Sequence, residues 1–133
     1  MGYQRYIAFD VETPNHANDR MSAIGVAVVE DGGVAETYDL LIDPQVPFDP
    51  FNVALTGITP ALVAGKPTFP EVWEVLRPVF ESGLLVAHNA QFDMSVLAKC
   101  LRAYGLFWRE RVDYACTCQM SRRLLPQLPN HRL

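Results

Sequence analysis

The amino-acid sequence predicts an α/β fold, in which helices pack against a mixed sheet of antiparallel and parallel strands. Two observations support this prediction. First, three strand-like segments follow one another near the N-terminus through short connections, which is typical of an antiparallel meander. Second, segments with helical periodicity then alternate with short apolar segments, an order that places helices against parallel strands.

The predicted meander consists of three segments rich in β-branched and aromatic residues. The first strand covers residues 3–11 and the second covers residues 22–30. An Asp-Gly-Gly sequence at residues 31–33 is a strong signal for a tight hairpin turn. The third strand therefore covers residues 34–42 and pairs with the second in the antiparallel direction.

A connecting region with several prolines follows the meander. Residues 43–50 form a loop, and residues 52–55 and 60–64 have the composition of short helical segments. Thr59 suits the N-cap of the second segment, and Pro60 is tolerated in a first helical turn.

The remaining elements alternate between helix and strand. Apolar residues recur at helical spacing over residues 70–80, where Pro78 indicates a kink or an early end. Residues 84–87 form a short apolar run typical of a buried strand. The last predicted elements are a helix at residues 91–104, a strand at residues 111–115, and a helix at residues 117–125 with Thr117 as its N-cap.

Composition limits the class of protein. The chain has 133 residues, of which 50% are hydrophobic and 20% charged, so we expect a single globular domain over residues 1–133. No apolar run is long enough to cross a membrane, and no signal peptide is present, which predicts a cytoplasmic protein with three reduced cysteines. The net charge of -4 argues against binding of nucleic acid by bulk positive charge, although bound metal ions would reverse the local field.

Carboxylates stand at the ends of two predicted strands. Asp10 and Glu12 are two residues apart in a strand, so they share a face, and Asp93 falls in the first turn of the helix after the strand at residues 84–87. Each feature has a plain structural explanation, since strands end in solvent, Asn89 suits an N-cap and Asp93 suits the helix dipole. Together, however, they supply hard oxygen ligands for Mg²⁺ or Mn²⁺. Two such ions, roughly 3.5–4 Å apart, support in-line attack at phosphorus.

These residues match motifs of a known family. The sequence Asp-Val-Glu-Thr at residues 10–13 resembles the first motif of the DnaQ-like (DEDD) 3′–5′ exonucleases, and His-Asn-Ala-Gln-Phe-Asp at residues 88–93 resembles the second. The intervening Leu-Thr-Gly-Ile-Thr at residues 55–59 is also similar. This family includes the proofreading epsilon subunit of bacterial DNA polymerase III. The resemblance implies a ribonuclease-H-like fold and metal-dependent removal of nucleotides from a DNA 3′ end.

The resemblance also implies roles for individual residues. Asp10, Glu12 and Asp93 are implied to be catalytic and to bind two divalent ions, Mg²⁺ or Mn²⁺. The residues implied to contact the 3′-terminal nucleotide, or to position the second motif beside it, are Val11, Thr13, Leu55, Thr56, Gly57, Asn89 and Phe92. Thr13 is placed near the 3′-oxygen, and Phe92 is expected to pack beneath the site.

One family feature is missing from the sequence. The family has a third motif, in which a His or Tyr precedes a fourth carboxylate on a late helix. This chain has no Asp or Glu after Asp113, and His131 lies in a segment, residues 128–133, that resembles the approach to the missing helix. We therefore expect residues 1–133 to lack the C-terminal part of the domain and to be inactive, or nearly so, alone.

Two alternatives share the same residues. A catalytically dead member would serve as a nucleic-acid or polymerase-binding module of the same fold. An RNA-directed relative of the oligoribonuclease type would act on RNA 3′ ends. The implied partners are thus a single-stranded 3′ end of DNA or RNA and a DNA polymerase subunit.

Overall fold

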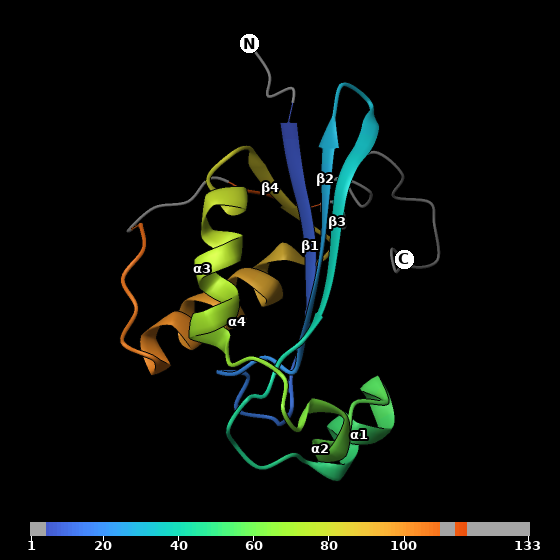
Figure 1. The fold of residues 1–133 in the computed structure, drawn as a ribbon, viewed down its shortest axis with the longest axis vertical. Helices are drawn as coiled ribbons and strands as arrows, with labels where there is room; N and C mark the ends of the chain where they lie inside the picture. The colour runs from blue at the N-terminus through green and yellow to red at the C-terminus, as the bar shows by residue number, and fades with distance from the viewer. Residues whose placement is uncertain (1–4, 110–113, 117–133) are drawn as a thin grey trace.

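A five-stranded mixed sheet forms the centre of the computed structural model, which describes residues 5–109 and 114–116 (Figure 1). The strand order across the sheet is β3-β2-β1-β4-β5. In chain order the strands are β1 (Arg5–Glu12), β2 (Ala23–Glu30), β3 (Gly33–Leu41), β4 (Leu84–Ala87) and β5 (Tyr114–Cys116). The first three pair antiparallel and the last two extend the sheet in parallel, which confirms the predicted mixed sheet.

The hairpin between β2 and β3 has the predicted turn chemistry. Asp31 and Gly32 both have positive φ values, 53° and 82°, as a two-residue type I′ turn requires. The third strand consequently starts one residue earlier than predicted, at Gly33.

β1 is the central strand, and its C-terminal half is paired on one side only. It pairs with β2 along its whole length, from Arg5 to Glu12, but with β4 only from Tyr6 to Ala8. The end of β1 therefore extends past its parallel neighbour and leaves space at that edge of the sheet.

Four helices complete the described part of the chain: α1 (Pro50–Thr56), α2 (Pro60–Val63), α3 (Phe69–Phe80) and α4 (Ala90–Ala103). Figure 1 shows α3 and α4 on one side of the sheet, and α1 and α2 beyond the end at which β1 finishes. The helix predicted from residue 70 begins at Phe69 and continues through Pro78 to Phe80, so Pro78 does not end it early. None of the helices in this described region is long and apolar enough to span a membrane.

The core lies between the sheet and the pair α3 and α4. Phe9 of β1 packs on Phe80 of α3 with ring centroids 5.1 Å apart, and Trp73 meets Trp108 at 5.0 Å. Cys100 is free and buried in α4, as its predicted inward position requires. The strand predicted at residues 111–115 is described from Tyr114 to Cys116, whereas the helix predicted at residues 117–125 and the segment 128–133 lie outside the described residues.

Candidate active site

The end of β1 and the first turn of α4 bring three predicted carboxylates into one region. Because β4 pairs with β1 no further than Ala8, the start of α4 occupies the space beside the end of β1. There the Val11 backbone N–H donates a hydrogen bond to the Asp93 carboxylate. Asp93 is only 5% exposed, so this contact fixes a buried acid against the strand end.

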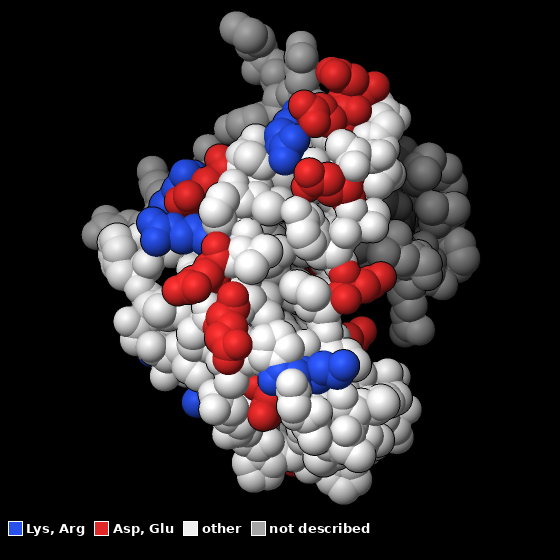
Figure 2. All heavy atoms as spheres, viewed as in Figure 1, with Lys and Arg blue, Asp and Glu red and all other residues white. Residues whose placement is uncertain are grey.

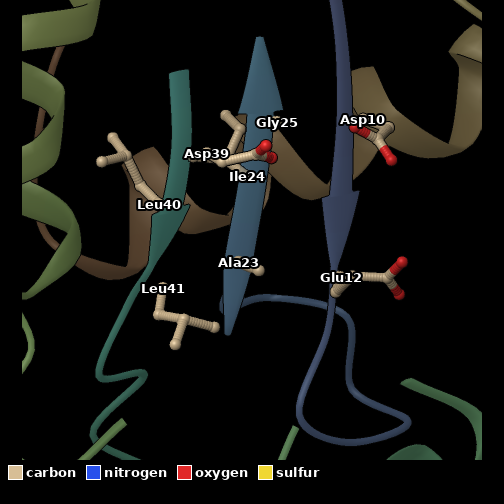
Figure 3. Close-up of a pocket in the computed structure, with 8 residues that line it drawn as sticks. All are labelled: Asp10, Glu12, Ala23, Ile24, Gly25, Asp39, Leu40 and Leu41. Atoms are coloured by element: carbon tan, nitrogen blue, oxygen red, sulfur yellow. The ribbon is translucent and has the colours of Figure 1, made fainter. Parts of the chain in front are cut away.

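Asp10 and Glu12 share one face of β1, as the two-residue spacing predicts. Figure 3 shows their side chains extending from β1 to the same side. Partial burial raises the pKa of Glu12, and the neighbouring Asp10 charge raises it further. The two acids therefore form a repelling pair at the strand end.

The charges of Asp10 and Glu12 also raise the pKa of Asp93. The pKa of Asp93 is raised from 3.8 to about 7: burial is the largest cause, the Val11 hydrogen bond lowers the pKa, and the charges of Asp10 and Glu12 also raise it. These shifts have the form expected of carboxylates that lack a neutralising cation. The three side chains thus act on one another electrostatically.

The donor chemistry suits a hard divalent cation, but the described side chains do not form a closed cage. Carboxylate oxygens are the ligands that Mg²⁺ and Mn²⁺ favour. Within the described residues, no group of three His, Cys, Asp or Glu side chains lies close enough together to hold a metal ion. Asp10, Glu12 and Asp93 therefore suit a metal ion by their oxygen atoms and by their mutual repulsion. In the described part of the chain, however, the three carboxylates do not converge closely enough to bind one ion together.

A further carboxylate, Asp39, lies near the site without having been predicted. An open pocket of about 270 Å³ is lined by Asp10, Glu12, Ala23, Ile24, Gly25, Asp39, Leu40 and Leu41 (Figure 3). Gly25 pairs with Asp10 on β1 and with Asp39 on β3, so all three lie in one row across the sheet. A β-carbon at Gly25 would lie 2.7 Å from Asp10 Oδ1 and 3.4 Å from Asp39 Oδ1. Only knowledge of the strand register would have revealed this row.

Thr13 and Asn52 form a buried polar contact between the end of β1 and α1. Asn52 Nδ2 donates to the Thr13 carbonyl oxygen at 3.0 Å and to Thr13 Oγ1 at 3.2 Å. The two residues are 7% and 8% exposed. Sequence analysis missed Asn52, because a polar residue in a short helix has no local signal for a contact 39 residues away.

The loop after β1 is also joined to the residues before α1. The Asp49 carboxylate accepts hydrogen bonds from the His16 backbone N–H at 2.9 Å and faces His16 Nδ1 at 2.7 Å. The Asp49 N–H donates to the Pro14 carbonyl, and Asn15 Nδ2 donates to the Pro47 carbonyl, both at 2.9 Å. These contacts hold the start of α1 beside the loop that follows β1.

α1 presents a neutral surface near the strand end. Residues 50–64, which include α1 and α2, contain no charged side chain, and Figure 2 shows the corresponding lower end of the molecule as largely white. Leu55 is 71% exposed, so it is open to contact. Thr56 Oγ1 donates to the Asn52 carbonyl at 2.8 Å, and Gly57 ends the helix with a φ of 74°.

The roles implied for Val11 and Phe92 stay predictions, and one expectation needs correction. The Val11 side chain is buried in the core, and its backbone N–H bonds to Asp93. Phe92 is 39% exposed. Asn89 occupies the N-cap position of α4, but it is in the left-handed conformation, with a φ of 60°, and its side chain makes no capping hydrogen bond.

Comparison with known sequences identifies relatives over nearly all of the chain. The profile of the exonuclease family RNase_T matches residues 7–133. The sequence is 31% identical over 130 residues to "DNA polymerase III PolC-type" of Caldanaerobacter subterraneus subsp. tengcongensis, and 33% identical over 131 residues to the protein of that name from Clostridium perfringens. Each match covers 96% of this chain and 9% of the relative, so the chain spans about a tenth of the length of these relatives.

Solved structures share the fold. Exonuclease X, in complex with 5′ overhanging duplex DNA, has a TM-score of 0.72 and 29% identity, over 94% of this chain and 67% of its own. The nuclease domain of 3′hExo, a DEDDh family member bound to rAMP, has a TM-score of 0.77 and 15% identity, over 96% and 72% of the two chains. An exonuclease I complex has a TM-score of 0.80 and 16% identity, over 96% of this chain and 32% of its own. These likenesses confirm the predicted ribonuclease-H-like fold class.

Proposed function

The chain belongs to the RNase_T exonuclease family, whose profile spans residues 7–133, and we propose that it is the exonuclease domain of a proofreading type that removes nucleotides from a DNA 3′ end. The observation that carries this proposal is the placement of Asp93 against the end of β1, where its pKa responds to Asp10 and Glu12. This placement supports a shared role for the acids of the two motifs.

In the proposed reaction, Asp10, Glu12 and Asp93 are the residues that would hold two divalent ions, Mg²⁺ or Mn²⁺. When bound, such ions activate the attacking water and stabilise the leaving oxygen. The protein's own contribution is to fix the carboxylates, through the sheet for Asp10 and Glu12 and through the Val11 N–H for Asp93. The neutral surface of α1, with Leu55, Thr56 and Gly57, would seat the terminal base and sugar.

The names of the relatives favour DNA as the substrate of this chain. PolC-type proteins are DNA polymerases by name, and exonuclease X was solved with duplex DNA. We therefore propose a single-stranded DNA 3′ end as substrate, a DNA polymerase as partner, and the bacterial cytoplasm as location. The rAMP bound to 3′hExo supports the alternative of an RNA 3′ end on the same fold.

A metal-binding experiment tests the proposed site. Addition of Mn²⁺ should raise the melting temperature of the wild type, because a cation relieves the repulsion among the three acids. The double variant Asp10→Ala, Glu12→Ala should lose this rise. Glu74→Ala, which removes an exposed carboxylate on α3, should retain it. An equal rise in the double variant would contradict the site.

A second measurement separates the functional alternatives. Fluorescence anisotropy with Mn²⁺ should show stronger binding of a linear single-stranded oligodeoxynucleotide than of the same sequence closed into a circle, because only the linear form has a 3′ end. Equal binding of both forms, with or without Mn²⁺, would favour a binding module instead. Stronger binding of the linear RNA oligonucleotide would favour the RNA-directed alternative.

A further inference from the structure

A second pocket lies between the loop after β3 and α2, and we propose that it binds a guanine base. The pocket has a volume of about 400 Å³ and is lined by residues of the loop 43–48, of α2 and by Ala64. Sites for small molecules have volumes of roughly 300–1,000 Å³. It shares no lining residue with the pocket at Asp10 and Glu12, so this inference goes beyond the proposed function and does not depend on it.

Most of the wall of this second pocket is apolar. The lining residues without a polar side-chain atom are Val46, Pro47, Phe48, Pro60, Val63 and Ala64. Val63 is only 3% exposed, so the α2 side of the pocket is packed into the molecule. Aromatic and proline rings on such a wall suit a flat ligand, such as a nucleobase, that buries its faces and keeps hydrogen bonds at its edge.

Asp43 carries the only charge among the described residues that line this pocket. Its Oδ1 accepts a hydrogen bond from the Gln45 backbone N–H at 3.0 Å, and its own N–H donates to the Pro67 carbonyl at 2.9 Å. Over residues 5–109 and 114–116, no lysine or arginine forms an ion pair with this carboxylate. Asp43 is therefore held in place while its remaining lone pairs can accept hydrogen bonds from a ligand.

Gln45 supplies a donor to the same pocket. The Tyr104 hydroxyl donates to Gln45 Oε1 at 3.1 Å, which fixes the amide oxygen toward α4. Among the described residues, no protein atom accepts a hydrogen bond from Gln45 Nε2. The two amide hydrogens thus remain for a ligand, and the pocket offers a carboxylate acceptor and an amide donor two residues apart.

Guanine matches this pair of groups better than the other bases do. Its Watson–Crick edge carries two adjacent donors, N1–H and the N2 amino group, beside the acceptor O6. The two oxygens of a carboxylate can accept both donors, while an amide NH₂ donates to O6. Adenine places the acceptor N1 where guanine has N1–H, so a carboxylate would repel it. Cytosine and thymine have no two adjacent donors.

A titration with two nucleotides tests the proposal. 5′-GMP and 5′-AMP carry the same sugar and phosphate, so a difference in their affinities reports recognition of the base. NMR titrations of the ¹⁵N-labelled full chain in EDTA should move the signals of Gln45 and Ala64, with GMP bound about tenfold more tightly than AMP. IMP, which lacks the N2 amino group, should bind with an affinity between these two.

Two isosteric variants separate recognition from packing. Asp43→Asn keeps an oxygen for the Gln45 N–H but sets an amide donor against the donors of guanine. Gln45→Glu keeps an oxygen for the Tyr104 hydroxyl but replaces the donor to O6 with an acceptor. Each variant should lose most of the preference for GMP, whereas Glu74→Gln, which neutralises an exposed carboxylate on α3, should keep it. Circular dichroism melting shows whether each variant is folded at the assay temperature.

Several results would overturn the proposal. Equal affinity for GMP and AMP would show binding through the sugar or phosphate, and nucleotide-induced shifts that bypass Gln45 and Ala64 would place the site elsewhere. A full preference for GMP in folded Asp43→Asn would contradict the role of the carboxylate. None of these results bears on the Mn²⁺ response of Asp10 and Glu12, so the proposed function is tested separately.

A final comparison identifies the source of the base once the preference for GMP is seen. A thymidine oligonucleotide with one internal guanine is titrated in EDTA beside the same oligonucleotide without it. Tighter binding of the guanine-containing strand, lost in Asp43→Asn, would support a base within a strand as the ligand. Equal binding of the two strands would support a free guanine nucleotide.

Discussion

Gly25 leaves the Asp10 carboxylate space that a β-carbon would occupy. In Gly25→Ala the new carbon would lie 2.7 Å from Asp10 Oδ1, so the carboxylate must rotate away from its position in the site. We expect a folded variant whose Mn²⁺-induced rise in melting temperature is at most half that of the wild type. Gly33→Ala is the matched control, because nothing lies within 4 Å of its added carbon. A wild-type response in Gly25→Ala would show that the position of Asp10 does not matter for the metal.

Asp93 makes the stability of the metal-free chain depend on pH. Its pKa is raised from 3.8 to about 7, so between these values the folded state holds a proton that the unfolded state has lost. Stability from this group is therefore highest at low pH and falls as the pH rises toward 7. Asp93→Asn removes the effect, and in EDTA we expect it to be more stable than the wild type at pH 8 by on the order of 2 kcal/mol.

Urea denaturation at several pH values measures this difference directly. The stability difference between Asp93→Asn and the wild type should shrink steadily from pH 8 to pH 5. Glu12 also has a raised pKa, but it is present in both proteins and contributes little to the difference. A variant no more stable than the wild type at pH 8 would show that burial does not penalise the Asp93 charge.

The site was predictable wherever its chemistry is local. Asp10 and Glu12 share a face because strands alternate every two residues, and Asp93 follows a strand within one helical turn. Asp39 and Asn52 were not predictable, because their places depend on strand register and on contacts between segments distant in the sequence. The contact of Val11 with the nucleotide stays a prediction, while its alternation with Asp10 accounts for the burial of its side chain in the core.

The bounds of some helices and strands follow from local sequence, whereas others depend on contacts with segments distant in the sequence. The α3 helix follows from its apolar periodicity, and its start is set by a capping box in which Thr68 and Glu71 bond reciprocally. That Thr-x-x-Glu pattern was present in the sequence and would have placed the start of α3 at Phe69. By contrast, the short overlap between β1 and β4 depends on where α4 packs, which local sequence does not specify.

That short overlap is what gives the fold its site. A longer β4 would pair with the end of β1 and satisfy the Val11 N–H within the sheet. Because pairing stops at Ala8, the first turn of α4 takes that place and supplies Asp93 instead. The parallel half of the sheet therefore positions one acid, and the antiparallel half positions Asp10 and Glu12.

The charge of the whole molecule predicts how binding of DNA depends on salt. The chain carries a net charge of -4, and Figure 2 shows acidic side chains spread over the visible face. Several basic side chains are already engaged, such as Arg5 with Glu30 at 2.9 Å and Arg77 with Glu81 at 3.5 Å. A protein of this kind has few cations with which to neutralise phosphates, so we expect few counterions to be released on binding.

We therefore expect a shallow salt dependence. At constant Mn²⁺, the logarithm of the affinity for a linear single-stranded oligodeoxynucleotide should fall with the logarithm of NaCl concentration with a slope no steeper than about -2, where each phosphate neutralised contributes about -0.7. Without Mn²⁺ the binding should weaken at every salt concentration, because the acids at the end of β1 then repel the strand. Anisotropy titrations between 50 and 200 mM NaCl, a range over which many phosphate contacts have a large effect, measure the slope. A slope near -5 would instead indicate a cationic surface that follows the DNA backbone, and binding would then not depend chiefly on the metal site.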